Sequence, residues 1–546
     1  MSETDSKLTF KSRAQPPADD TTLPKNRWIR FLKFEVKTWT LHGSDKTLKG
    51  TELMVDEKVR RHGTFRLHGL EVWGELILSG ENSQLRLRTE EGPTNWSAPE
   101  VMHGRLHDSE LVSCIHCVGE STTTRVWDGA DQSSRSWSLF PHQVLSGRSY
   151  FDPCQDRIGK VWFSTDDIYR IFDDFDSFGI LAHPDIQLQS SVPQMIGDRQ
   201  VPIGPEPHMV YFAGRSKLLG AQLSFGKFEV QHWLSSQSNS QGARITTQIR
   251  VQVEFESALT LNDCLGKVAS IGQFLSLVAG RAQGIENLQV AVDGRDSHEP
   301  PLSVHWSLGP RQISGQELNT PSWIDMPLDG IRRADEFRQV IERWFSSNEH
   351  AVARARLYSC RQSDNQFDID RLVKAANMFD LANHLTPAKV ANDLANVRDK
   401  CISALRTLPS SDDRDSAIRE LKRIGAPTLT SKVLSRAAML RGHFHLEDLD
   451  KMLRQAVLCR NYFVHGPGDK RFNYAAVQGY TPFLTETLEF VFAAAELIEC
   501  GWAAGDWRLH PHTGHHWFSR FTSDYRILSQ ELLSDLKRTK KQESLK

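Results

Sequence analysis

The sequence lacks a long apolar run, a signal-peptide pattern and a marked net charge. Its 546 residues contain no run of about 18 or more apolar residues, so we expect no membrane span. The polar, mixed-charge N-terminus has no apolar core of the kind that directs secretion. With a formal charge of −2, any nucleic-acid partner would have to be held by a local basic patch.

Cysteine is sparse, and two common catalytic motifs are missing. Eight scattered cysteines in a chain without a secretion signal are most simply reduced thiols, so we expect a cytoplasmic protein. The chain has no GxxxxGK[ST] loop and no GxSxG motif, which argues against a P-loop ATPase and an α/β-hydrolase.

The length and the ordinary apolar fraction of 39% indicate two or three domains with real cores. Up to about residue 256 the sequence is strand-like, with alternating β-branched and aromatic residues at 65–78 and 244–255. A helical pattern follows at 261–280, then strand patterns at 288–292 and 302–306. Helical periodicity dominates after residue 332, with helices predicted at 333–361, 367–384, 390–407, 412–424, 428–440, 445–464 and 480–500.

These patterns predict an α+β multidomain protein, in which a β-rich domain of sandwich or barrel type precedes an all-α helical bundle. We expect a disordered tail over residues 1–25, the β-rich domain over 26–310 and a linker over 311–332. The helical bundle should then cover 333–505, and a His-rich loop with a basic C-terminal helix or tail should cover 506–546.

The helix predicted at 445–464 carries the most informative motif. Its apolar stripe steps through residues 446, 449, 453 and 457, and the next position on that stripe holds Arg460. A guanidinium group on an apolar face needs a partner or an interface, because unpaired burial is costly. Asn461 and His465 share a neighbouring face, and Gly-Pro-Gly at 466–468 should end the helix at His465.

An arginine beside a histidine at a helix end suits metal-independent cleavage of RNA. Attack of a ribose 2′-hydroxyl on its phosphate needs one proton removed and one donated, and histidine can do such work. The negative charge that gathers on the phosphate suits the planar fork of arginine. One arginine and one histidine per chain are few, which makes a dimer that pairs two such helices attractive.

The bare spacing of Arg and His is weakly specific, since it recurs at Arg61–His68, Arg436–His443 and Arg508–His515. Only the Arg460 match combines a long amphipathic helix, a polar residue after the arginine and a glycine stop. An interior arginine paired to a carboxylate, beside a capping histidine, remains an equally good interpretation of these local features.

The segment Arg460-Asn-Tyr-Phe-Val-His465-Gly resembles the R-x4–6-H motif of HEPN domains. The N-terminal region resembles that of ApeA-type anti-phage HEPN proteins, where residues 251–261 lead into Ile-Gly-Gln-Phe-Leu-Ser-Leu-Val-Ala-Gly-Arg at 271–281. Residues 371–380 also look like a helix of that family that ends in a polar and an acidic residue. Together these segments span about half of the chain.

The resemblance implies a dimeric or higher-order HEPN ribonuclease of abortive anti-phage defence that needs no cofactor. Arg460, His465 and Asn461 match the catalytic motif, and Asn377 and Asp380 would orient them from an adjacent helix. Tyr462 is a further supporting candidate, and two basic residues are candidate RNA contacts, Lys470 and Arg471. The substrate would be cellular RNA, with tRNA a reasonable candidate, and the product a 2′,3′-cyclic phosphate.

The resemblance also bears on control of the activity. Pro467 stands where some HEPN toxins carry a modifiable tyrosine, so we expect regulation through the N-terminal domain instead. A phage-encoded trigger or inhibitor is a further expected partner. One alternative is a non-catalytic HEPN module that binds a nucleotide or a partner protein. The other is a carbohydrate- or protein-binding β-domain on a helical scaffold.

Two clusters have the composition of metal sites. Cys114 and Cys117 have suitable spacing but no second pair at zinc-finger distance, so two thiols on a strand is the better interpretation. The histidines at His510, His512 and His515 could bind a metal or stack on RNA bases, but a surface loop packed by Trp507 and Trp517 is favoured. We therefore expect no metal in the active site.

Overall fold

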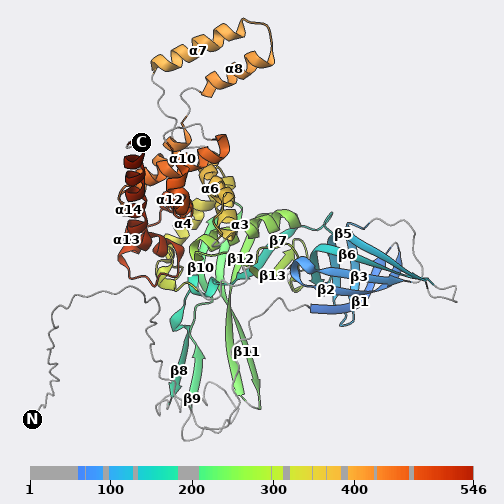
Figure 1. The fold of residues 1–546 in the computed structure, drawn as a ribbon. Coiled ribbons are helices and arrows are strands. Elements are labelled where there is room, and N and C mark those ends of the chain that lie inside the picture. Colours follow the sequence, from blue (N-terminus) through green and yellow to red (C-terminus); the bar gives the residue numbers. More distant parts are fainter. Residues whose placement is uncertain are drawn as a thin grey trace, which may run out of the picture. The chain divides into compact units, whose positions relative to one another are not determined.

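The computed structural model describes most of the chain from residue 59 onward (Figure 1). The described ranges are 59–67, 69–89, 98–126, 133–182, 208–240, 242–296, 298–311, 320–346, 348–363, 366–382, 392–423, 427–466 and 472–544. They fall within one compact unit, Asp56–Lys546. None of the helices in these ranges is both long and apolar enough to cross a bilayer. The tail expected at 1–25 lies outside the described residues.

Six strands of the N-terminal part form a closed antiparallel barrel in the order β6-β3-β2-β1-β4-β5 (Figure 1). The ring closes because β5 pairs with β6 as well as with β4. Buried and exposed residues alternate along β1, where Phe65 and Leu67 face inward, as the period of a strand requires. The strands are β1 (Val59–Leu67), β2 (Leu70–Leu78), β3 (Gln84–Thr89), β4 (Val101–Leu106), β5 (Leu111–Val126) and β6 (Ser133–Gly147).

Strand β6 also continues into an open antiparallel sheet, in the order β10-β11-β12-β7-β13-β14-β6. The other members are β7 (Ile158–Thr165), β10 (Lys217–Leu223), β11 (Gly226–Asn239), β12 (Gly242–Leu259), β13 (Ile285–Val292) and β14 (Leu302–Trp306). A separate two-stranded sheet pairs β8 (Phe178–Ala182) with β9 (His208–Phe212), and the short helix α1 (Ile168–Ile171) precedes it.

Helix α3 (Leu261–Ala279) is the long helix of the β-rich part, and it packs on the open sheet through β7. Its first turn is capped by Thr260, whose hydroxyl accepts a hydrogen bond from the Asp263 amide at 3.2 Å. It ends at Gly280, where φ is +78° and an added Cβ would lie 2.3 Å from the His516 ring. Glycine is therefore required there both by the left-handed backbone and by the close approach of the C-terminal segment.

The regular secondary structure of the C-terminal part is helical throughout its described ranges. It contains α4 (Ala334–Ser346), α5 (Ala351–Gln362), α6 (Ile369–Leu381), α7 (Asn392–Arg406), α8 (Asp412–Arg423), α9 (Leu429–Ala438), α10 (Leu449–His465), α11 (Tyr474–Val477), α12 (Thr481–Glu499), α13 (Ala504–Leu509) and α14 (Trp517–Ser544). Helix α12 is the central one, because it contacts α5, α6, α9, α10 and α14 and most of its residues are buried. The predicted order of a β-rich part followed by an all-α part is confirmed.

Two details differ from the sequence expectation. The helix predicted over 333–361 is two helices, α4 and α5, since the chain turns between them and α5 begins after His350. Part of the expected linker is packed, because the run from Asp325 to Gly330 is buried throughout, whereas Trp323 and Arg332 are exposed. The buried Asp325 carboxylate accepts hydrogen bonds from the Thr513 and His515 amides, which attaches this segment to the His-rich loop.

Two hydrophobic cores result. One fills the barrel and includes Phe65, Trp137 and Leu139. The other is continuous from the open sheet through α3 and α4 into the helices around α12. Phe274 of α3 is part of this junction, with ring centroids 5.8 Å from Phe337 and 5.4 Å from Trp344 of α4. The open sheet and the helical part therefore share one interior.

Candidate active site at the end of helix α10

Helix α10 delivers Arg460 and His465 to the same place. Its buried face runs through Leu449, Met452, Leu453, Ala456 and Val457, and Arg460 continues that face at its half-buried end. The helix stops at His465, and Gly466 follows with φ at +80°, a conformation that favours glycine. The predicted glycine stop is therefore present at Gly466, while residues 467–471 lie outside the described ranges.

The Arg460 guanidinium group contacts three polar side chains. Nη1 donates to Asn461 Oδ1 at 3.1 Å and lies 3.2 Å from His465 Nε2. Nη2 donates to Asn377 Oδ1 of helix α6 at 3.0 Å. Because arginine can only donate, the contact with His465 requires an unprotonated Nε2, which is the state that can accept a proton. The exposed imidazole and the half-buried guanidinium thus face one point at the surface.

No carboxylate pairs with Arg460 among the residues that the structure describes. Its neighbours are two amides and one imidazole, and its Nε is buried without a hydrogen-bond partner. An interior arginine held for structural reasons alone would be expected to sit on a carboxylate. The geometry therefore favours the interpretation of Arg460 as an anion-binding group over that of a paired interior arginine.

The supporting residues expected from the resemblance fall into two groups. Asn377 lies against Arg460, as described above, whereas Asp380 pairs with Lys432 of helix α9 at 2.9 Å. Tyr462 turns away into an aromatic cluster and stacks on Tyr474, with ring centroids 5.2 Å apart. Asn377 can thus orient Arg460 directly, whereas Asp380 contacts neither Arg460 nor His465 among the described residues. The expected RNA contacts, Lys470 and Arg471, lie outside the described residues.

Arg436, one of the chance matches to the motif, shows what a structural arginine looks like in this fold. Its buried guanidinium pairs with Glu496, and with Glu499 at 2.5 Å, both on helix α12. Glu496 also accepts from Arg354 of α5 at 2.7 Å. Burial favours the protonated form of Glu496, but the hydrogen bond from His350 and the charges of Arg354 and Arg436 outweigh it and lower the pKa of Glu496.

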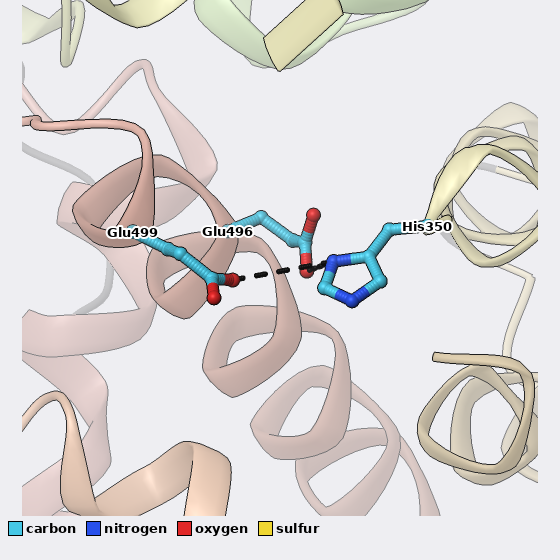
Figure 2. Close-up of side chains that lie close together, drawn as sticks. All are labelled: His350, Glu496 and Glu499. Atoms are coloured by element: carbon cyan, nitrogen blue, oxygen red, sulfur yellow. Dashed lines mark ion pairs between the residues drawn. The ribbon is translucent and has the colours of Figure 1, made fainter. Parts of the chain in front are cut away.

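Figure 2 shows the three residues of this network that have the chemistry of metal ligands, His350, Glu496 and Glu499. His350 Nδ1 lies 2.8 Å from Glu496 and 4.0 Å from Glu499. The guanidinium of Arg436 already lies among these three groups, since it donates to both carboxylates and its Nη2 is 3.0 Å from His350 Nδ1. The residues therefore do not fit a metal ion, because a cationic side chain takes the position that an ion would need.

The two metal candidates from the sequence lie elsewhere. Cys114 and Cys117 are buried on strand β5, where burial raises the pKa of the Cys117 thiol to about 12. Both are therefore core thiols of the barrel. In the His-rich loop, His510 and His515 are exposed, and His512 lies 3.0 Å from the Trp507 carbonyl oxygen. Trp507 and Trp517 are buried, which agrees with a loop packed by two tryptophans.

Sequence reasoning missed the buried charges of helix α12. Glu489 accepts from Arg371 at 2.7 and 2.9 Å and from Arg361 at 3.2 Å, and Glu496 lies seven residues further along the helix. Two carboxylates seven apart in a largely apolar helix occupy one face, and that spacing was the available signal. These ion pairs join α12 to α5, α6 and α9, and so fix the helix that supports α10.

Comparison with known proteins gave one match. A family model described as ApeA N-terminal domain 1 covers residues 60–344. No curated protein and no solved structure matched the chain. The matched stretch contains the barrel, the open sheet and α3, and it ends in α4, before the helices that carry Arg460. Because it covers more than half of the chain, this protein belongs to the ApeA family.

Proposed function

We propose that this protein is a metal-independent endoribonuclease of the HEPN class. Membership of the ApeA family indicates a role in anti-phage defence. The observation that carries the proposal of RNA cleavage is Arg460, whose charge has no carboxylate partner among the described residues and which lies 3.2 Å from His465. An unpaired cation beside a titratable base is what phosphodiester cleavage needs.

The proposed chemistry uses side chains alone. His465 Nε2 accepts the proton of a ribose 2′-hydroxyl, the 2′-oxygen attacks the adjacent phosphorus, and the bond from phosphorus to the 5′-oxygen breaks. Arg460 stabilises the charge that collects on the phosphate oxygens. A second histidine, His465 of the partner subunit, donates the proton that the leaving 5′-oxygen takes. The products are a 2′,3′-cyclic phosphate and a 5′-hydroxyl, and cellular RNA, including tRNA, is the proposed substrate.

The test is cleavage of total tRNA and of a labelled single-stranded RNA by the purified full chain in EDTA. His465→Ala and Arg460→Ala should each lower the rate by roughly two to four orders of magnitude. Arg454→Ala and His445→Ala are matched controls, since both residues are exposed and lie on or just before the same helix. Both control variants should cleave like the wild type.

Product analysis and mass measurement complete the test. The new 3′ ends should be cyclic phosphates, and a 2′-deoxy substitution at the cut site should abolish cleavage there. The solution mass should be at least twice 62.0 kDa. Equal activity of the wild type and both active-site variants would refute the proposal and favour a non-catalytic module. Loss of activity only with EDTA would refute the metal-independent mechanism.

A further inference from the structure

A pocket lies where the ApeA N-terminal region meets the C-terminal helices. Its walls come from α3, from the turn between β10 and β11, from α4 and α5, and from Trp517 at the start of α14. The free space between the lining side chains, counted together with the open mouth, is about 880 Å³. The pocket is separate from the Arg460 site, since no residue of α10 lines it.

All of the charged side chains that line the pocket are cationic. Four cationic side chains line it, Lys267, Arg281, Arg354 and Arg361, and none of the lining residues is acidic. The carboxylates that hold the arginines stand behind the wall: Asp167 pairs with Arg281 at 2.6 Å, Glu496 with Arg354 at 2.7 Å and Glu489 with Arg361 at 3.2 Å. A ligand in the pocket would therefore meet the cations and not their partners.

Two of these cations are held rigidly before any ligand binds. Arg354 lies 4.0 Å from the ring centre of Trp344, and Arg361 lies 4.4 Å from that of Trp517. A ring on one side and a carboxylate on another leave each guanidinium little freedom. Ligand binding would therefore cost little side-chain entropy at these two arginines. The Nε of Arg361 is buried and has no hydrogen-bond partner.

Lys267 is the lining cation whose charge is not balanced by a carboxylate among the described residues. Its ammonium group lies 4.9 Å from the ring centre of Phe225, and no ion pair is formed by it within the described ranges. Polar groups suited to a heterocycle edge complete the wall, namely the amides of Gln273, Asn348 and Gln362. Cations, flat apolar surfaces and amides together match a ligand that has an anionic end and a planar polar ring.

We infer that this pocket binds a mononucleotide, with the phosphate near Lys267 and the arginines and the base among the aromatic and amide side chains. An inorganic anion would leave the aromatic surface unused, and a neutral ring would leave Lys267 without a counter-charge. Because the wall combines α3 with α5, the nucleotide would contact both the family-matched region and the helical part. The inference does not depend on RNA cleavage.

The test measures binding to the full chain that carries His465→Ala, so that the proposed nuclease activity has no part in the readout. The probes are AMP, GMP, CMP, UMP and ATP, with adenosine, inorganic phosphate and pyrophosphate for comparison, in titration calorimetry. At least one nucleotide should bind at submillimolar concentration, and more tightly than adenosine or either phosphate probe.

Two pocket variants and one matched control locate the site. Lys267→Glu should weaken the binding of that nucleotide by at least about tenfold, because it reverses the uncompensated charge. Ser270→Trp, at a half-buried position of the wall on α3, should abolish binding by filling the pocket. Lys160→Glu is the control, since Lys160 is also a lysine over an aromatic ring, 5.9 Å from Trp162, and lies on β7 outside the pocket.

The control should bind like the parent, and all variants should keep the parent's melting temperature within a few degrees. Should Lys267→Glu unfold, Ser270→Trp decides alone. Absence of binding by every nucleotide, equal binding of pyrophosphate and nucleotide, or equal weakening in Lys160→Glu and Lys267→Glu would each overturn the inference.

Discussion

Arg460 and Arg436 differ in role because their side-chain partners differ. Arg436 is 2% exposed and pairs with two carboxylates, whereas Arg460 contacts amides and an imidazole. The first satisfies its charge inside the protein, and the second keeps its charge available. Both lie on a helix with a histidine five to seven residues ahead, so the difference depends on residues far away in the sequence.

The partners of Arg460 lead to a prediction about Asn377. Asn377→Asp would place a carboxylate 3.0 Å from Nη2, neutralise the guanidinium and compete with a phosphate. We expect a loss of cleavage rate larger than that of Asn377→Ala, which should lose about tenfold, the equivalent of one hydrogen bond. Steady-state cleavage of a labelled RNA measures both. A faster Asn377→Asp than Asn377→Ala would show that Arg460 does not act through its free charge.

Arg436 gives the opposite expectation. Arg436→Met should lower the free energy of unfolding by about 3–5 kcal/mol, because it removes one partner of a buried ion pair. Arg460→Met should cost much less, since no carboxylate loses its partner. Urea denaturation of the two variants beside the wild type measures the difference, and equal losses would mean that the two arginines do not differ in role as their contacts indicate.

At the scale of the elements, the helices after residue 366 were predictable and the helix contacts were not. The helical period and the stop signals placed α6, α9, α10 and α12 within a few residues of their observed ends. This works because the spacing of apolar residues along the sequence already shows which face of an amphipathic helix is buried. The barrel closure of β5 on β6 and the packing of residues 325–330 depend on contacts between distant segments. The same holds for Asn377, which only the family resemblance placed near Arg460.

The start of α14 carries a pH dependence. His516 is fully buried against Gly280, and its Nδ1 accepts a hydrogen bond from the Phe518 amide at 3.1 Å. Burial lowers the pKa of His516 to about 3. Between pH 6.5 and about 3 the unfolded chain therefore binds a proton at this residue that the folded chain does not, so the stability that it contributes is complete above pH 6.5 and is lost as the pH falls.

We expect His516→Gln to reduce the loss of stability at low pH, because glutamine stays neutral and can still accept a hydrogen bond from the Phe518 amide. The slope of the unfolding free energy against pH between 6.5 and 4.5 should fall by up to about 1.4 kcal/mol per pH unit relative to the wild type. Urea denaturation at pH 7.5, 6.5, 5.5 and 4.5 measures this slope. Parallel curves for the two proteins would show that His516 is not held neutral in the folded state.

At the scale of the whole molecule, the boundary of the family match does not coincide with a boundary of the fold. The match ends at residue 344 inside α4, and the larger core continues from α3 and α4 into α5 and α12. The barrel, in contrast, encloses a core of its own. The chain is therefore better divided between the barrel and the remainder than between the β-rich part and the helical part.

Two truncations test this division. A fragment of residues 56–346 should aggregate or bind a hydrophobic dye, since removal of α5 and α14 exposes apolar faces of α3 and α4. A fragment of residues 56–147, which holds the six barrel strands, should be soluble with a β-type circular dichroism spectrum. A well-folded 56–346 with a cooperative melting transition would contradict the shared core.

The separate interior of the barrel also bears on how such a protein can evolve. Apart from Ile115 and Leu145, which belong to the larger core, a residue on the outer wall of the barrel can mutate without disturbing the interior that the open sheet shares with the helices. Much of this lobe can therefore diversify quickly. Helix α3 has no such freedom, because the sheet lies against one side and α5 against another. If phages change rapidly, the barrel is the part of the molecule that can change its sequence with the smallest loss of stability.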